Sequence, residues 1–202
     1  MTSRRWLREG RSDLASDRIL DAAAAVFVRQ GVARTSMADV AREAGCSRAT
    51  LYRYFDDRPA LRTAFVHREA RRLAAEVAAE IAGLDDLVER TVEAVMLCVS
   101  KVRDRPTLHA WFAAGNVGIT RDLIDSSDVI EGVAAAFLGR TGDPEEADWL
   151  VRTVVSLVVL PGTDADSERS MLRRFVAPAL RLGACGEPSK GSVPGLRALL
   201  AP

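Results

Sequence analysis

The sequence predicts an all-α protein with two parts: an N-terminal three-helix domain that contains a helix-turn-helix, and a larger all-helical domain after it. Apolar residues recur at intervals of three and four positions along most of the chain, and no segment shows the alternation of a strand. Capping residues, glycines and prolines separate these apolar segments. The 202 residues are enough for one large or two small domains with a real core.

The first and last helices of the N-terminal domain flank the helix-turn-helix. The first has Ser16 as its predicted N-cap and stops at Gly31. Its inward face consists of Ile19, Leu20, Ala23, Val26 and Phe27. The last begins after Asp57, which can cap it, and Pro59 is tolerated in its first turn because that position needs no N–H donor. Leu61 and Phe65 then continue the apolar face.

Residues 35–55 predict two short helices joined by a tight turn. Thr35 or Ser36 can cap the first helix, and Asp39 stands three residues after Ser36, as in a capping box. An apolar stripe follows, made of Met37, Val40, Ala41 and Ala44. Gly45 ends this helix, because the chain must pass through a left-handed conformation that a β-carbon disfavours. This segment is the predicted helix-turn-helix.

The second helix of the motif carries the groups that recognise nucleic acid. Ser47 is its predicted cap, and Leu51 and Phe55 point inward. The outward residues are Arg48, Ala49, Thr50, Tyr52, Arg53 and Tyr54. Guanidinium and hydroxyl groups form hydrogen bonds with phosphates and base edges, so we expect double-stranded DNA as the partner.

The charge distribution supports DNA binding by the N-terminal part. Residues 1–74 contain 15 arginines, no lysine and nine acidic residues, whereas residues 75–202 carry an excess of six negative charges. The formal net charge of zero therefore hides an asymmetry between the two parts. Four of the arginines, Arg4, Arg5, Arg8 and Arg11, form a basic arm before the first predicted helix. This arm either contacts DNA, in the minor groove or along the backbone, or is a tail without a specific role.

The N-terminal third resembles the TetR family of bacterial transcriptional regulators. The matching segments are Arg18–Ala23, Phe27, Gly31, Thr35–Ala41, Ala44–Ser47, Thr50–Tyr52, Tyr54 and Phe55. The resemblance implies a DNA-binding domain at residues 13–73 with the helix-turn-helix at 36–55, a helical ligand-binding and dimerisation domain at 74–182, and a flexible tail at 183–202. It also implies a homodimer that represses transcription from a palindromic operator and is released by a small apolar or amphipathic inducer.

The resemblance assigns roles to individual residues of the DNA-binding domain. Four are expected at phosphates: Thr35, Tyr52, Tyr54 and Arg58. Three occupy positions that contact bases: Arg48, Ala49 and Thr50. Three more complete the predicted DNA-binding set: Ser36, Ser47 and Arg53. The sequence departs from the family pattern at Cys46, where valine is common, and at Arg58, where lysine is common.

The C-terminal part predicts further helices and a subunit interface. After a break at Gly83 they lie at about residues 85–103, 121–138, 144–160 and 166–182, and Pro106 either ends the first of these or opens a short helix. The helix at 144–160 is apolar nearly all round, so it is buried on both sides. The resemblance implies that the last two long helices pair with those of a second subunit; a large monomeric core is the alternative.

A ligand site in the C-terminal part is predicted from soft and aromatic side chains accompanied by a few polar groups. These residues are Met96, Cys98, Lys101, His109, Trp111, Phe112, Asn116 and Phe137. Simple core packing is the alternative for the apolar members. Lys101 is either a partner for an anionic ligand or a solvated cation. Cys98 is a candidate redox sensor only if its thiolate is stabilised.

The remaining features narrow the function class. Three scattered cysteines, at positions 46, 98 and 185, indicate a reducing cytosol, so we expect a cytoplasmic protein. The cysteines and the two histidines show no metal-ligand spacing, and no secretory signal or membrane-spanning segment is evident. Without a nucleophile motif or a phosphate-binding glycine loop, we expect neither a cofactor nor an enzyme. An adaptor that binds a protein partner through its helical half remains a second hypothesis.

Overall fold

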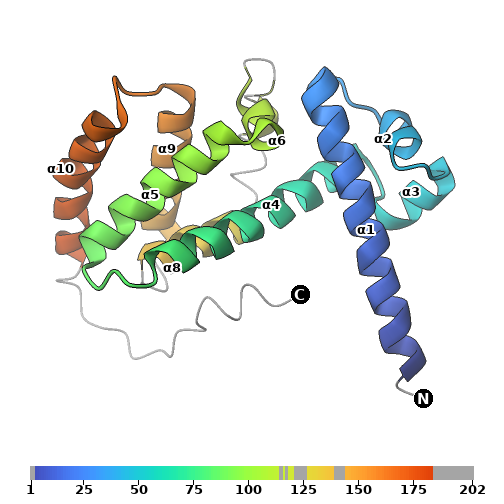
Figure 1. The fold of residues 1–202 in the computed structure, drawn as a ribbon, viewed down its shortest axis with the longest axis horizontal. Coiled ribbons are helices and arrows are strands. Elements are labelled where there is room, and N and C mark those ends of the chain that lie inside the picture. Colours follow the sequence, from blue (N-terminus) through green and yellow to red (C-terminus); the bar gives the residue numbers. More distant parts are fainter. Residues whose placement is uncertain (1–2, 114–115, 117, 121–126, 139–143, 184–202) are drawn as a thin grey trace. The chain divides into compact units, whose positions relative to one another are not determined.

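The computed structural model describes residues 3–113, 116, 118–120, 127–138 and 144–183, and this part of the chain contains helices but no strand (Figure 1). The all-α prediction is therefore confirmed. The chain divides into two compact units. Unit 1 comprises residues 1–68 and 106–123, and unit 2 comprises residues 69–105 and 124–202.

Unit 1 contains α1 (Ser3–Gln30), α2 (Met37–Glu43), α3 (Arg48–Tyr54) and the first turns of α4 (Arg58–Ile81). The prediction that the first helix begins at Ser16 is wrong, because α1 already begins at Ser3. The preceding residues are mostly good helix formers such as arginine, leucine and alanine, so nothing stops the helix there. Residues 3–13, which include the basic arm, are thus the first turns of α1.

The turns of the helix-turn-helix follow the sequence prediction closely. Ser36 and Asp39 form a complete capping box at the start of α2. Gly31 and Gly45 have φ values of 83° and 65°, the left-handed conformations that glycine adopts without steric cost. Ser47 caps α3 by accepting a hydrogen bond from the Thr50 amide at 3.0 Å. Gly45 and the Ser47 cap fix the short connection between α2 and α3, whereas Gly31 and the capping box shape the loop before α2.

An aromatic trio occupies the core of unit 1. The rings of Phe27 and Phe65 meet edge to face with centroids 5.3 Å apart, and Trp111 stacks on Phe65 at 5.7 Å. Trp111 belongs to η1 (Ala110–Phe112), which follows the short α6 (Pro106–His109). The predicted domain boundary at residue 74 therefore differs from the observed division, in which residues 106–123 join the N-terminal unit. The physical reason is the burial of Trp111 against two N-terminal phenylalanines.

Unit 2 contains the rest of α4, together with α5 (Leu87–Asp104), α8 (Asp128–Leu138), α9 (Pro144–Val159) and α10 (Ala165–Gly183). Helix α5 packs against α8, α9 and α10, which places it at the centre of the unit (Figure 1). The helix expected at residues 121–138 is observed from Asp128, and its first part at 121–126 lies outside the described residues. The tail predicted at 183–202 also lies outside them, apart from Gly183.

Ion pairs join α5 to α10. The deepest is between Arg103 and Glu168, whose carboxylate accepts hydrogen bonds from Arg103 Nη2 at 2.7 Å and from Nη1 at 3.0 Å. It also accepts one from the Gly162 amide at 2.7 Å. The Arg103 hydrogen bonds hold the pKa of Glu168 below its ordinary value. Two more exposed pairs run along the same helices: Arg169 with Glu93 and Arg173 with Glu89.

Within the described ranges, no helix combines the length and the apolar character that crossing a bilayer requires.

Candidate nucleic-acid interface

Helix α3 presents a polar face on a rigid apolar base. Leu51 is fully buried and Phe55 is nearly so, which anchors the helix on the core of unit 1. Of the outward residues, four are exposed to solvent: Arg48, Ala49, Tyr52 and Arg53. Thr50 and Tyr54 are half-buried. The predicted inward positions of Leu51 and Phe55 are therefore confirmed, whereas Tyr54, predicted to point outward, packs partly against the core.

The hydroxyl groups of α3 differ in how accessible they are. Tyr52 is 41% exposed, so its phenol is available to a phosphate. Tyr54 packs against the core, and the guanidinium of Arg53 lies over its ring at 5.3 Å from the centroid. Ser47 Oγ and Thr50 Oγ1 are 2.9 Å apart at the start of the helix, where Ser47 Oγ also accepts from the Thr50 amide. This end of α3 therefore combines hydroxyl and amide groups suited to an anionic oxygen.

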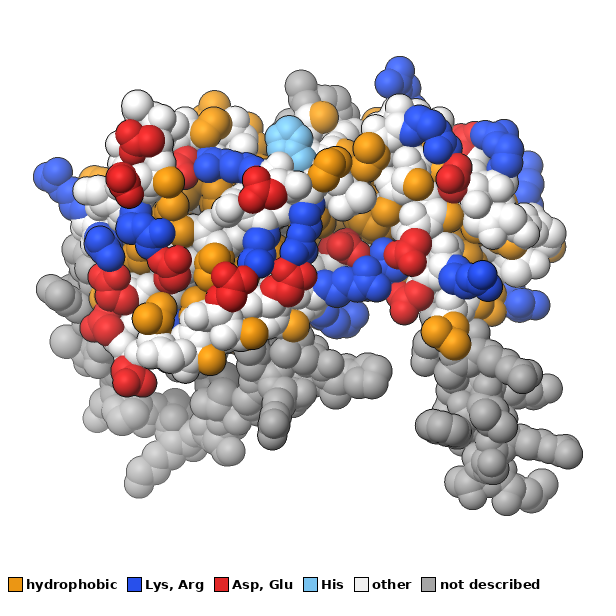
Figure 2. Space-filling model, in the orientation of Figure 1, with side chains coloured by type: hydrophobic (Ala, Val, Ile, Leu, Met, Phe, Trp, Pro, Cys, Tyr) orange, Lys and Arg blue, Asp and Glu red, His pale blue; other side chains and the backbone are white. Residues whose placement is uncertain are grey.

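The arginines of the interface are not neutralised by neighbouring carboxylates. Among the described residues, Arg48 and Arg53 pair with no acidic side chain, whereas Arg29 pairs with Glu43 at 2.9 Å. Figure 2 shows basic side chains gathered along the edge of the molecule where α2 and α3 lie. Positive charge on this edge attracts the phosphate backbone of DNA.

Three predicted DNA-binding residues support the loop between α1 and α2. Thr35 is only 1% exposed, and its hydroxyl donates to the Gly31 carbonyl at 2.9 Å. The hydroxyl therefore supports the loop in the free protein, and the phosphate contact expected of Thr35 stays a prediction. Arg58 is exposed and donates to the Ala33 carbonyl at 3.3 Å. Ser36 is exposed, but its hydroxyl is engaged in the capping box with Asp39.

The capping box also lowers the pKa of the Asp39 carboxyl. Hydrogen bonds from Ser36 and Gln30 lower the pKa of Asp39 to about 2. Asp39 therefore stays ionised at the start of α2, where a negative charge interacts favourably with the helix dipole. Arg42 pairs with the same carboxylate. The positive charge of Arg42 is thus partly compensated by Asp39, unlike the charge of Arg48.

Sequence reasoning missed Arg62, which lies one turn after Arg58 on α4. Arg62 is buried, and its Nη2 donates to the Val32 carbonyl at 2.7 Å. Burial lowers the pKa of this guanidinium, yet arginine remains charged at neutral pH. The sequence carried one indication of this role: Arg62 stands four positions after Arg58, so both arginines lie on the same face of the helix.

The predicted ligand-site residues divide between the two units. Trp111, Phe112 and Asn116 belong to unit 1, where Trp111 lies in the core and Phe112 packs against it. His109 also belongs to unit 1. The remaining four, Met96, Cys98, Lys101 and Phe137, belong to unit 2, and all of these except Lys101 are buried. The core-packing alternative is therefore the observed role of Trp111.

The two chemically reactive members of this set have defined surroundings. Lys101 pairs with Glu80 at 2.7 Å and with Glu76 at 3.3 Å, so its charge is satisfied by α4 carboxylates. Burial raises the pKa of the Cys98 thiol to about 12. The thiolate needed for redox sensing is therefore strongly disfavoured.

A helix-turn-helix on an all-α scaffold, with an exposed cationic recognition helix, defines the class of DNA-binding transcriptional regulators. A sequence model described as "Bacterial regulatory proteins, tetR family" matches residues 19–65. An uncharacterized HTH-type transcriptional regulator of Mycobacterium tuberculosis, Rv1255c, is 46% identical over 179 residues, which cover 86% of this chain and 89% of that protein. The chain belongs to the TetR family.

Solved structures support the same fold. The TetR family repressor AlkX from Dietzia, implicated in biodegradation of n-alkanes, has a TM-score of 0.60 at 22% identity and covers 82% of this chain and 94% of its own. RolR in complex with resorcinol has a TM-score of 0.61 at 16% identity, covering 91% of this chain and all of its own. A TetR-family regulator from Streptomyces coelicolor gives 0.61 at 20%, covering 81% of this chain and 98% of its own.

Proposed function

We propose that this TetR-family regulator is a homodimeric repressor that binds a palindromic operator and is released by a small apolar or amphipathic inducer. The observation that carries the DNA-binding part is the exposed, unneutralised face of α3 on its buried base of Leu51 and Phe55. Arg48 is our candidate for a base contact, and Tyr52 and Arg53 are candidates for phosphate contacts.

The homodimer is supported by apolar side chains that a single chain leaves in solvent. On α9, Trp149 is 39% exposed although the opposite side of the helix is buried. On α10, Met171 is 43% and Phe175 is 63% exposed. Large apolar groups left open on neighbouring elements indicate a protein interface. A second copy fits best, because two reading heads in a two-fold dimer would recognise a palindrome.

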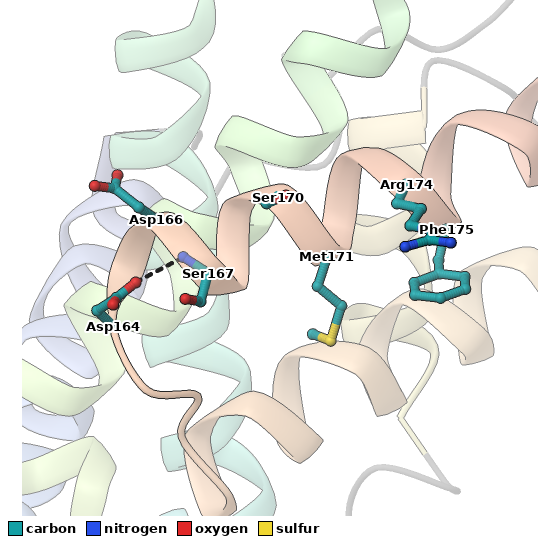
Figure 3. A pocket seen from close by; sticks show the side chains of 7 residues that line it. All are labelled: Asp164, Asp166, Ser167, Ser170, Met171, Arg174 and Phe175. Atoms are coloured by element: carbon teal, nitrogen blue, oxygen red, sulfur yellow. Dashed lines mark hydrogen bonds between the residues drawn. The ribbon is translucent and has the colours of Figure 1, made fainter.

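A shallow hollow on α10 forms part of this open surface. Its volume is about 550 Å³, and Met171 and Phe175 line it together with Arg174 and polar residues near the helix start (Figure 3). The Arg174 guanidinium lies 5.9 Å from the Phe175 ring centroid. The hollow can accept a bulky side chain of the partner subunit, as the cores of stable interfaces do.

The inducer is proposed from the buried side of unit 2 and from the relatives. Met96 and Phe137 are buried apolar side chains of unit 2, and we propose them as lining groups for a small ligand. RolR carries resorcinol in its solved complex, and AlkX is implicated in n-alkane degradation. If an inducer favours a state that does not fit the operator, inducer and operator must weaken each other by the same factor.

Selection of bound duplexes from a random library with the purified full-length protein tests the proposal. We expect an enriched palindrome with half-sites about one turn, roughly 34 Å, apart. Its affinity should fall steeply with salt, since each neutralised phosphate releases counterions. A single asymmetric half-site would contradict the dimer, and no enrichment at low salt would contradict operator binding.

The inducer is tested separately. Small aromatic and aliphatic compounds are screened by thermal shift, and those that stabilise the protein are added to the operator complex. We expect a true inducer to weaken operator binding. A stabilising compound that leaves operator affinity unchanged would contradict the release mechanism.

A further inference from the structure

The loop between α1 and α2, residues 31–36, is held by side chains from distant parts of the chain. Arg62 donates to the Val32 carbonyl at 2.7 Å, and Arg58 donates to the Ala33 carbonyl at 3.3 Å. Both come from α4 and both occupy acceptors of the loop. The Ala33 amide, a donor, needs a partner of the opposite kind.

Asn116 supplies that partner. Its Oδ1 accepts a hydrogen bond from the Ala33 amide at 3.1 Å, and its Nδ2 donates to the Ala110 carbonyl at 2.7 Å. Asn116 is only 4% exposed, and both of its hydrogen bonds are part-buried. The side chain thus bridges the loop to the segment that carries Trp111.

The segment is itself fixed in unit 1. Trp111 stacks on Phe65 and meets the edge of Phe27 at 5.4 Å between centroids. The Thr120 hydroxyl donates to the Trp111 carbonyl at 2.7 Å, a bond internal to the segment. Asn116 is therefore an acceptor within unit 1, and the geometry of the Ala33 amide depends on a residue 83 positions further along the chain.

We propose that Asn116 is a positioning residue for DNA binding: by holding the Ala33 amide, it sets the loop that delivers Ser36 to the start of α2. Helix α2 is joined to α3 by the tight turn at Gly45, so a displaced loop displaces the recognition helix. Asn116 acts through the loop and contacts no DNA. The inference rests on the proposed function in one respect, since operator binding is its readout.

The test compares Asn116→Ala with Thr120→Val in the full-length protein. Asn116→Ala removes two hydrogen bonds of the Asn116 side chain and Thr120→Val removes one nearby, but only Asn116→Ala frees the loop. We expect Asn116→Ala to weaken operator binding about five- to tenfold, the equivalent of one lost hydrogen bond. Thr120→Val should leave affinity within about twofold at a similar loss of Tm. The salt dependence should be unchanged in both, because no phosphate contact is removed.

Hydrogen exchange supplies a second readout that a general loss of stability would not reproduce. The Ala33 amide should exchange faster in Asn116→Ala and at the wild-type rate in Thr120→Val. Equal operator affinity in wild type and Asn116→Ala, or equal Ala33 exchange, would overturn this inference alone. A wild-type protein that selects no operator would instead overturn the proposed function, while Ala33 exchange still reports whether Asn116 holds the loop.

Discussion

Replacing Glu168 by alanine is expected to lower the free energy of unfolding by about 3 kcal/mol. The substitution removes the more deeply buried partner of the Arg103–Glu168 ion pair. Glu168 is 2% exposed, whereas the side chain of Arg103 is 30% exposed. The substitution leaves the Arg103 guanidinium and the Gly162 amide without their shared acceptor. The loss would loosen α10, which carries the proposed dimer surface.

The magnitude follows from the degree of burial. Removing one partner of a fully buried ion pair costs about 3–5 kcal/mol. Because Arg103 retains some contact with water and still donates to the Leu157 carbonyl at 2.7 Å, we expect the lower end of that range. The matched control is Glu89→Ala, which removes an exposed pair with Arg173 between the same two helices. It should cost below about 1 kcal/mol.

Urea denaturation followed by far-UV circular dichroism measures both variants. The protein concentration is held fixed and then varied, since the unfolding of a dimer depends on it. A Glu168→Ala loss no larger than that of Glu89→Ala would refute the reasoning. A second check is the double variant Arg103→Met with Glu168→Met, which should lose less than the two single variants combined.

The same ion pair predicts a pH dependence. Hydrogen bonds from Arg103 lower the pKa of Glu168 in the folded protein, so the carboxylate stabilises the fold above its ordinary pKa of 4.5. This contribution is lost as the pH falls through 4.5 towards the folded pKa. The stability difference between wild type and Glu168→Gln should therefore be constant from about pH 7 to 5 and shrink below that. A difference that grows in acid would contradict the assignment.

Three further substitutions and one deletion test the interface and the dimer. Arg48→Ala should weaken the best operator by about 1–3 kcal/mol and relax its base preference; a uniform loss across sequences would make Arg48 a backbone contact. Tyr52→Phe should weaken all sequences alike in the same binding assay. Deleting residues 2–12 should reduce the salt slope by about 0.9 for each arginine that contacts a phosphate, and an unchanged slope would assign the arm no role. Phe175→Glu should yield monomers in analytical ultracentrifugation without changing the helical content, and a persistent dimer would move the interface elsewhere.

Much of the DNA-binding domain was predictable from short segments of sequence. The capping box at Ser36, the left-handed turn at Gly45 and the inward Leu51 depend on residues within four positions of one another. Steric limits on φ and local hydrogen bonds act at this range, so a single sequence carries their signal. The start of α1 was predicted wrongly. Ser16 is a residue type that often caps a helix, but here it lies inside a helix that begins at Ser3.

Long-range placement was decided by the tertiary structure alone. The Thr35 hydroxyl donates to the Gly31 carbonyl inside the protein, a placement that its position before α2 did not indicate. Lys101 found its partners on α4, and Trp111 joined a core formed by residues more than 40 positions away. By itself, the sequence determined the family, the helices and the recognition face, since these rest on local spacing. Only the folded chain could bring Asn116 to Ala33, because that contact depends on the path of the whole intervening backbone.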